Sequence, residues 1–229
     1  MKRLLVVCLI LALLTSTALA AGKLSVEQEN FHVIDSYSVY GYAYAKVANV
    51  GDKPIKINTG LLEIFNSDGD ALTSTDYYYG YAEYLQPDEY TYVYLYDQVE
   101  DVEASMVDDY MVTLTGKANT DYVSHRFPCT TEYVPNVREG YWTYNYMYTT
   151  VTNDTEEPVY GIEVVLALLD AEGNILFMDS ENLYNDVALM PGSSITIRKD
   201  VSSSFIEYFE KNGLVPTTVE AIAFVDIEK

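Results

Sequence analysis

The feature that most constrains the fold is an internal repeat. Residues 33–87 align with residues 137–191 at a constant offset of 104, with no gap, and 13 of the 55 aligned pairs are identical. The identical pairs include turn-forming residues at three positions: Asn49 and Asn153, Pro54 and Pro158, and Gly69 and Gly173. Tyrosine is abundant and inflates the count, so these turn residues carry the most weight. The repeat predicts two domains of one design.

Charge supports the same division. Residues 21–128 hold 18 acidic and 6 basic residues, and residues 129–229 hold 17 and 5, so each half carries a charge of −12. The expected domains are residues 30–125 and 133–229, with a linker over residues 126–132. Pro128 lies within this linker and Pro135 follows it, and both disfavour a helix in this region.

Strand patterns dominate both copies. Alternating β-branched and aromatic residues over 39–48, 90–96 and 195–198 predict strands. An apolar strand at 60–65 and its counterpart at 162–169 each end at a hairpin turn in which glycine supplies a positive φ. Short strands separated by frequent turns predict an all-β protein with two tandem antiparallel Ig-like β-sandwich domains.

One short helix in each copy would close an open end of its sandwich. In the second copy, Phe205, Tyr208 and Phe209 have helical spacing after a serine pair, and Gly213 supplies a stop. In the first copy, the corresponding expectation is a short helix that uses three apolar residues: Val99, Val102 and Met106.

The first twenty residues have the pattern of a signal peptide. Lys2 and Arg3 precede an apolar stretch over 4–14, and Ala18-Leu19-Ala20 is a small-residue cleavage motif. The apolar stretch is shorter than the ~20 residues that a membrane-spanning helix needs. We therefore expect cleavage after Ala20, no membrane insertion afterwards, and a bacterial product that is secreted, extracellular or held in the cell envelope.

Charge and cysteine content limit the partners and the source of stability. The chain has 13 basic and 35 acidic residues among 229, and removal of Lys2 and Arg3 leaves 11 against 35, a net charge of −24. Such acidity opposes binding to nucleic acid, whose phosphates would be repelled. Cleavage also removes Cys8, so Cys129 has no cysteine partner within the chain, and stability must come from burial.

Each repeat resembles the FxLYD domain, a small β-sandwich module of secreted and envelope-associated bacterial proteins. The residues that carry the resemblance are the strands Leu62–Asn66 and Leu166–Asp170, the turn Asn49–Pro54, and the segments Leu85–Pro87 and Leu189–Gly192. Neither copy keeps the Phe or Tyr of the family's name. The resemblance implies the sandwich fold and brings no catalytic residue.

The sequence lacks several familiar motifs of catalytic, metal-binding and phosphate-binding sites. His32 and His125 stand outside any metal-ligand spacing, and neither a Gly-x-Ser-x-Gly motif nor a glycine-rich phosphate loop occurs. The acidic run over 97–109 lacks the residue order of a calcium loop. We therefore expect no catalytic residue, no metal and no cofactor. A hydrolase built from scattered carboxylates remains an alternative, because 35 acidic residues offer many pairs.

Tyrosine is the unusual feature of the first copy. Thirteen of the 23 tyrosines lie between Tyr37 and Tyr96, and period-two spacing places two runs of them each on one face of a strand. These candidate binding residues are Tyr40, Tyr42, Tyr44, Tyr90, Tyr92, Tyr94 and Tyr96. Val93 aligns with Ile197, so its side is expected to point inward, whereas the tyrosines of 90–96 align with polar residues.

The tyrosines are therefore expected to point outward, where rigid rings with polar tips suit recognition of a protein or a glycan. Three alternatives stay open. Cross-strand tyrosine pairs could simply stabilise the sheet, the face could pack on the second domain, or the protein could be a self-assembling component of the cell envelope. Binding to a protein or glycan without catalysis is the function that the sequence favours.

Overall fold

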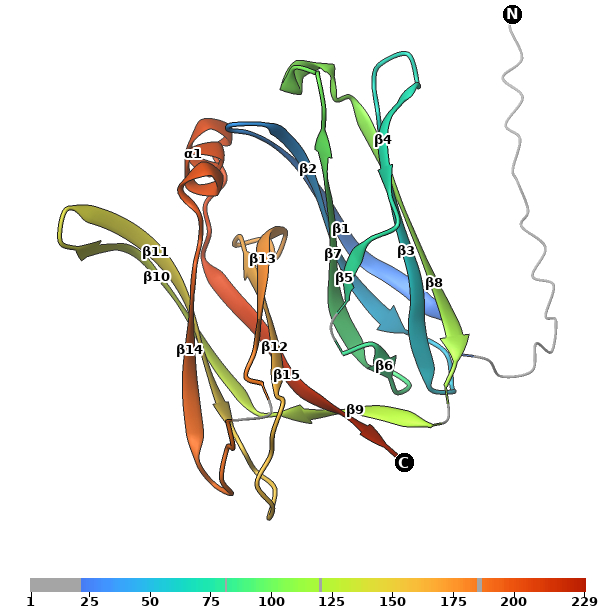
Figure 1. Cartoon of the computed structure of the whole chain (residues 1–229), viewed down its shortest axis with the longest axis vertical. Helices are drawn as coiled ribbons and strands as arrows, with labels where there is room; N and C mark the ends of the chain where they lie inside the picture. Colours follow the sequence, from blue (N-terminus) through green and yellow to red (C-terminus); the bar gives the residue numbers. More distant parts are fainter. Residues whose placement is uncertain (1–21, 81, 120, 185–186) are drawn as a thin grey trace, which may run out of the picture.

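Strands make up most of the structure, a computed structural model that describes residues 22–80, 82–119, 121–184 and 187–229. The predicted signal peptide, residues 1–20, lies outside the described residues. Figure 1 shows two halves side by side, with the first in blue to green and the second in yellow to red. The prediction of an all-β protein is confirmed. No helix in the described ranges is long and apolar enough to cross a bilayer.

The first half consists of two antiparallel sheets that face each other. One sheet has the order β1 (Leu24–Asp35), β2 (Val39–Asn49), β7 (Tyr90–Val99), β5 (Tyr78–Gly80). The other has the order β4 (Ala71–Thr75), β3 (Ile55–Phe65), β6 (Tyr84–Leu85), and β8 (Asp109–Ala118) also pairs with β3. Alternate residues of these strands, such as Val93 and Ile64, form one buried apolar cluster between the sheets. We call this half the first sandwich.

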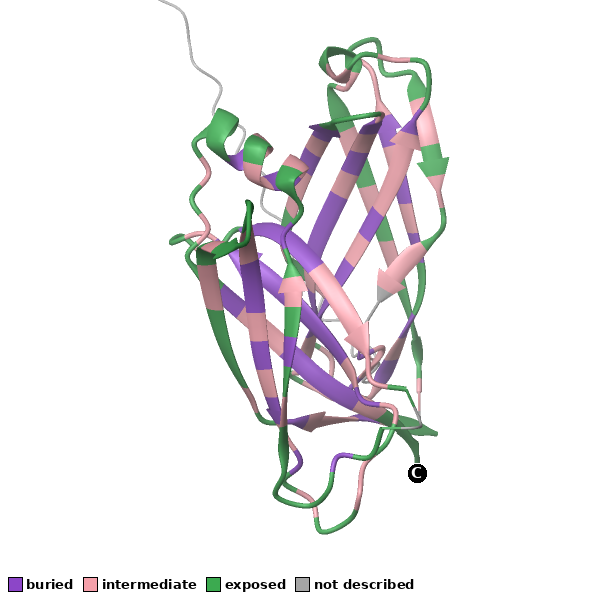
Figure 2. Ribbon diagram, turned by 60° about the vertical axis from the view of Figure 1, so that its left-hand side comes forward, coloured by how far each residue is buried: buried purple, intermediate pink, exposed green. Residues whose placement is uncertain are grey.

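The second half repeats the plan. One sheet has the order β10 (Cys129–Glu139), β11 (Trp142–Thr152), β14 (Ser194–Asp200). The facing sheet has the order β13 (Ile175–Asn182), β12 (Glu163–Leu169), β15 (Thr218–Glu228), β9 (Tyr122–Phe127). The helix α1 (Ser203–Asn212) lies at one end of this second sandwich (Figure 1). Buried residues alternate with less buried ones along many strands of both halves (Figure 2).

Matched turns explain why the repeat keeps its asparagine. The amide nitrogen of Asn49 donates to the carbonyls of Lys53 (2.8 Å) and Leu85 (3.1 Å), which ties the β2–β3 turn to the end of β6. Asn153 makes the same two bonds, at 2.8 and 2.7 Å, to the carbonyls aligned with these two. Both asparagines are fully buried, so an amide that satisfies several backbone groups at once is required there.

The predicted helix is confirmed in the second copy and wrong in the first. In α1, Phe205 and Phe209 are buried, and Gly213 ends the helix in the left-handed conformation with φ of 69°. In the first sandwich, the described segment where the helix was expected forms a 3₁₀ turn at Ala104–Met106 instead. The positions aligned with the two phenylalanines are Asp101 and Ser105, so this segment has no apolar stripe to bury.

The segment expected as a linker, residues 126–132, is strand except at Pro128. Its first two residues end β9 and the rest begin β10. Because β9 pairs with β15 and Phe127 is buried in the second sandwich, this strand belongs to the second half although residues 122–125 were expected in the first. The first sandwich also begins earlier than expected, since β1 starts at Leu24 rather than near residue 30.

Candidate binding cleft between the two sandwiches

The two runs of tyrosines come together on one side of the β1-β2-β7-β5 sheet. Pairing of β2 with β7 places Tyr42 opposite Tyr96 and Tyr44 opposite Tyr94, and β5 adds Tyr79 beside Tyr94. The rings stack, with centroids 5.3 Å apart for Tyr42 and Tyr96 and 4.7 Å apart for Tyr79 and Tyr94. We call this surface the tyrosine face; its members are Tyr40, Tyr42, Tyr44, Tyr79, Tyr90, Tyr92, Tyr94 and Tyr96.

The predicted direction of these side chains relative to their own sheet is confirmed. Val93 and Leu95 are fully buried in the core of the first sandwich, whereas the tyrosines between and beside them point to the opposite side of the sheet. Tyr44 and Tyr92 instead belong to the core cluster of the second sandwich. The tyrosine face is thus the outer face of the first sandwich and the surface that meets the second.

Tyr44 and Tyr92 correct the expectation that all of these tyrosines point outward into solvent. Each is only 1% exposed, because the second sandwich covers it. The Tyr92 hydroxyl donates to the Glu220 carboxylate at 2.5 Å, and the Tyr90 hydroxyl lies 3.5 Å from the same oxygen. Packing on the second half, one of the alternatives from the sequence, describes this part of the face.

Polar residues of β1 complete the contact, and sequence reasoning missed them. The amide of Asn30 donates to the Ile175 carbonyl at 2.9 Å, and His32 Nε2 lies 3.2 Å from the same oxygen. His32 Nδ1 lies 3.4 Å from the Tyr208 hydroxyl on α1. Burial lowers the pKa of His32 below its ordinary value, which favours a neutral ring that donates through Nε2 and accepts through Nδ1. Only the alternation along β1 hinted that these residues share a face with the tyrosines.

A cleft opens where the two halves diverge beyond this contact. Its volume is about 490 Å³, within the usual range for small-ligand sites. The first sandwich supplies Tyr40, Tyr42, Tyr44, Tyr94 and Tyr96. The second supplies Phe177, Met178, Asp179, Ser202 and Phe205. Five of the seven predicted binding residues thus line one cleft, while Tyr90 and Tyr92 lie in the contact beside it.

Ring geometry and charge determine what the cleft can hold. Tyr42 and Phe205, one from each sandwich, contact each other edge to face within the cleft lining, with ring centroids 5.0 Å apart. Burial, and secondarily the neighbouring Tyr96, raises the pKa of Tyr42, so its hydroxyl stays a neutral donor and acceptor. Asp179 is the acidic residue of the lining, and burial raises its pKa while Lys199, 3.3 Å away, opposes the shift.

The groups that could bind a metal or react as a thiol are few among the described residues. Across the described residues, no group of three or more His, Cys, Asp or Glu side chains is placed to hold a metal ion. Cys129 is a free thiol at the start of β10, and its Sγ lies 3.5 Å from the Phe127 carbonyl. Burial raises the pKa of the Cys129 thiol, which disfavours the reactive thiolate.

No protein-family model and no curated protein matches this chain. Among solved structures, the chain is similar to a crystal structure of transglutaminase from red sea bream, with 10% sequence identity and a TM-score of 0.23. The match covers 78% of this chain and 27% of that one. A likeness with this TM-score carries no argument about activity.

Proposed function

We propose that this protein is a non-catalytic binding module that holds a glycan in the cleft between the sandwiches. The observation that carries the proposal is the lining: five tyrosines face two phenylalanines, with one carboxylate and one serine hydroxyl among them. Aromatic rings pack against the C–H faces of sugars, while neutral phenol hydroxyls and a carboxylate pair with sugar hydroxyls. A lining of this kind suits a neutral, hydroxyl-rich ligand.

The rigidity of the tyrosine face supports the same proposal. Stacked neighbours and the hydroxyl contact of 3.2 Å between Tyr79 and Tyr96 restrict the rings before any ligand arrives. Side chains that are already ordered lose little conformational entropy on binding. The net charge of −24 after signal cleavage further favours neutral over anionic ligands.

The proposal places this function outside the cytoplasm. This location is supported by the predicted signal peptide over residues 1–20 and by the resemblance to FxLYD modules, and both are features of the sequence. A carboxylate-based hydrolase is the weaker alternative. Glycoside hydrolysis ordinarily uses two carboxylates that flank the scissile bond, whereas Asp179 is the acidic residue that lines this cleft.

The test combines a glycan array with calorimetric titration of the best ligand. In the variant Tyr40→Ser/Tyr96→Ser, both substitutions fall on half-buried cleft residues, and we expect about tenfold weaker binding or more. The matched control, Tyr160→Ser/Tyr184→Ser, removes two exposed tyrosines outside the cleft lining and should bind like the parent. Circular dichroism checks that each variant is folded.

Two results would overturn the proposal. One is an array without a specific ligand; the other is a folded cleft variant that keeps the parent's affinity. Sedimentation of the purified protein tests the self-assembling alternative. A concentration-dependent oligomer that disappears in Tyr40→Ser/Tyr96→Ser would replace glycan binding with assembly through this cleft.

A further inference from the structure

A second kind of groove occurs at the end of each sandwich, and neither groove shares a lining residue with the cleft between the sandwiches. In the second sandwich it lies between the β10–β11 hairpin and α1, with a volume of about 440 Å³. Its lining includes the apolar side chains of Trp142, Tyr144 and Ile206 and the carboxylates of Asp200, Glu207 and Glu210. We call it the α1 groove.

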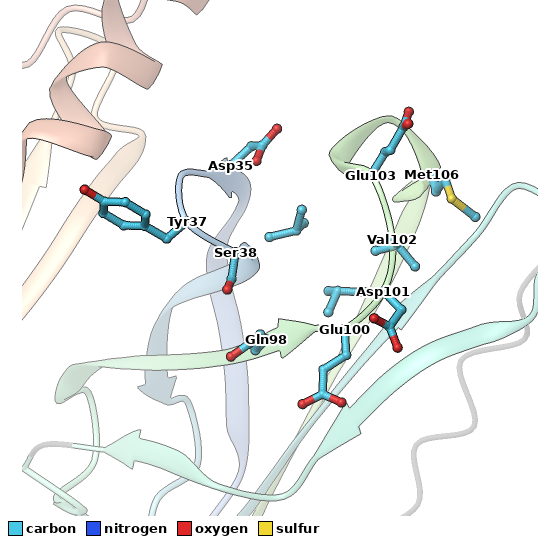
Figure 3. A pocket seen from close by; sticks show the side chains of 11 residues that line it. Asp35, Tyr37, Ser38, Gln98, Glu100, Asp101, Val102, Glu103 and Met106 are labelled. Atoms are coloured by element: carbon cyan, nitrogen blue, oxygen red, sulfur yellow. The ribbon is translucent and has the colours of Figure 1, made fainter.

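The first sandwich has a counterpart, shown in Figure 3, between the β1–β2 turn and the segment that follows β7. Its volume is about 670 Å³. At the offset of 104, Val102 and Glu103 of this groove align with Ile206 and Glu207 of the α1 groove. Both copies thus combine an apolar residue with a carboxylate at the same place, although one segment is helix and the other is not.

The hairpin tips beside the grooves carry aromatic residues that nothing in their own sandwich covers. Tyr37 and Tyr141 are an identical aligned pair, and both are fully exposed, at 106% and 99%. Trp142, which follows Tyr141 and lines the α1 groove, is 71% exposed. Exposed aromatic side chains are enriched at interaction surfaces, and a cluster of them beside a groove indicates such a surface.

Charge identifies the kind of partner. The α1 groove has three carboxylates and no basic side chain among its lining residues. Arg198, two residues before Asp200, is paired with Glu139 at 2.9 Å, on the β10 side of the hairpin. Burial raises the pKa of Asp200, and the neighbouring Arg198 opposes this shift. The lining therefore carries negative charge that no basic side chain of the groove balances, and a cationic partner would complement it.

Lysine and arginine match this combination better than a simple ion does. Their aliphatic stems pack along apolar surface while the charged end reaches a carboxylate, and both cations are attracted to the face of a Trp ring. We propose that the α1 groove docks a Lys- or Arg-bearing segment of a partner protein, with Trp142 and Ile206 against the stems and Glu207 and Glu210 at the charged ends. This surface is separate from the glycan cleft.

The experiment uses a fluorescein-labelled peptide, Gly-Leu-Lys-Gly-Arg-Leu-Lys-Gly, and fluorescence anisotropy at moderate salt. We expect saturable binding that becomes about tenfold weaker in Glu207→Gln/Glu210→Gln. Both residues are exposed on α1, so the variant should stay folded. Trp142→Ser should weaken binding as well, because it removes the apolar part of the groove.

The matched control distinguishes binding of the peptide in the groove from its general attraction to an acidic protein. Glu156→Gln/Glu157→Gln makes the same change in net charge at two exposed residues outside the lining and should bind the peptide within about twofold of the parent. Equal weakening by both charge pairs, or full affinity in folded Trp142→Ser, would overturn the proposal. Glycan binding should be unchanged in Glu207→Gln/Glu210→Gln, so failure of one proposal is distinguishable from failure of the other.

Discussion

Replacing Asn153 with alanine should test how the repeated turn holds each sandwich together. The Asn153 side chain is fully buried and makes four hydrogen bonds. Its amide nitrogen donates to the carbonyls of Glu157 (2.8 Å) and Leu189 (2.7 Å). Its oxygen accepts from the backbone N–H of Thr155 (2.9 Å) and from the Thr155 hydroxyl (2.7 Å). Alanine would remove all four bonds.

The expected cost follows from these bonds. A net contribution of ~1 kcal/mol each suggests a loss of up to ~4 kcal/mol. Neither carbonyl would be left alone, because Leu189 still accepts from the Val159 N–H at 3.1 Å, and the single Thr155 hydroxyl proton, no longer taken by Asn153, can turn to the Glu157 carbonyl 2.9 Å away. No carbonyl is therefore left entirely unpaired, and we expect the free energy of unfolding to fall by about 3 kcal/mol.

Urea unfolding followed by circular dichroism measures this loss. With a slope of ~2 kcal/mol/M, the midpoint should move down by about 1.5 M. Asn49→Ala should have a similar effect in the first sandwich, and Asn58→Ala, at an exposed position, should change the free energy by less than about 0.5 kcal/mol. A loss below about 1 kcal/mol for Asn153→Ala would refute the assignment of this side chain as the tie between turn and loop.

Two further predictions concern the contact between the sandwiches. Burial lowers the pKa of His32 below 6.5, so the folded state binds a proton less readily than the unfolded state does. The free energy of unfolding should therefore fall as the pH drops below about 6.5, by at most ~1.4 kcal/mol per pH unit. Urea unfolding at pH 7 and pH 5 should show a smaller difference for His32→Gln than for the parent; equal differences would exclude this role. Tyr92→Phe removes the hydroxyl that donates to Glu220, and in the same assay the free energy of unfolding should fall by about 1–2 kcal/mol. The exposed control Tyr184→Phe should leave the free energy of unfolding unchanged. Equal effects of the two substitutions would contradict a stabilising contact between Tyr92 and Glu220.

Local patterns in the sequence were enough to predict much of the architecture. The offset of 104, the turns at Asn49 and Asn153, and the inward direction of Val93 all agree with the structure. Each depends on nearby residues, because period-two alternation orients a side chain relative to its own strand and turn residues act within a few positions. The helix α1 was predictable for the same reason, since its buried residues lie four apart in the chain.

What covers an outer face is decided by residues far away in the sequence. Tyr92 and its partner Glu220 are 128 positions apart, and nothing in the period of either strand relates the two. Alternation could say that Tyr44 and Tyr92 leave the core of the first sandwich, but not whether water or the second sandwich lies beyond them. That depends on the second sandwich, whose β13-β12-β15-β9 sheet packs against Tyr44 and Tyr92. The strand β9, expected in part as linker, is an edge strand of that sheet. The sequence determined the orientation of the tyrosines within their sheet; only the tertiary structure, through the packing of two complementary surfaces, decided which of them are buried and which line a cleft.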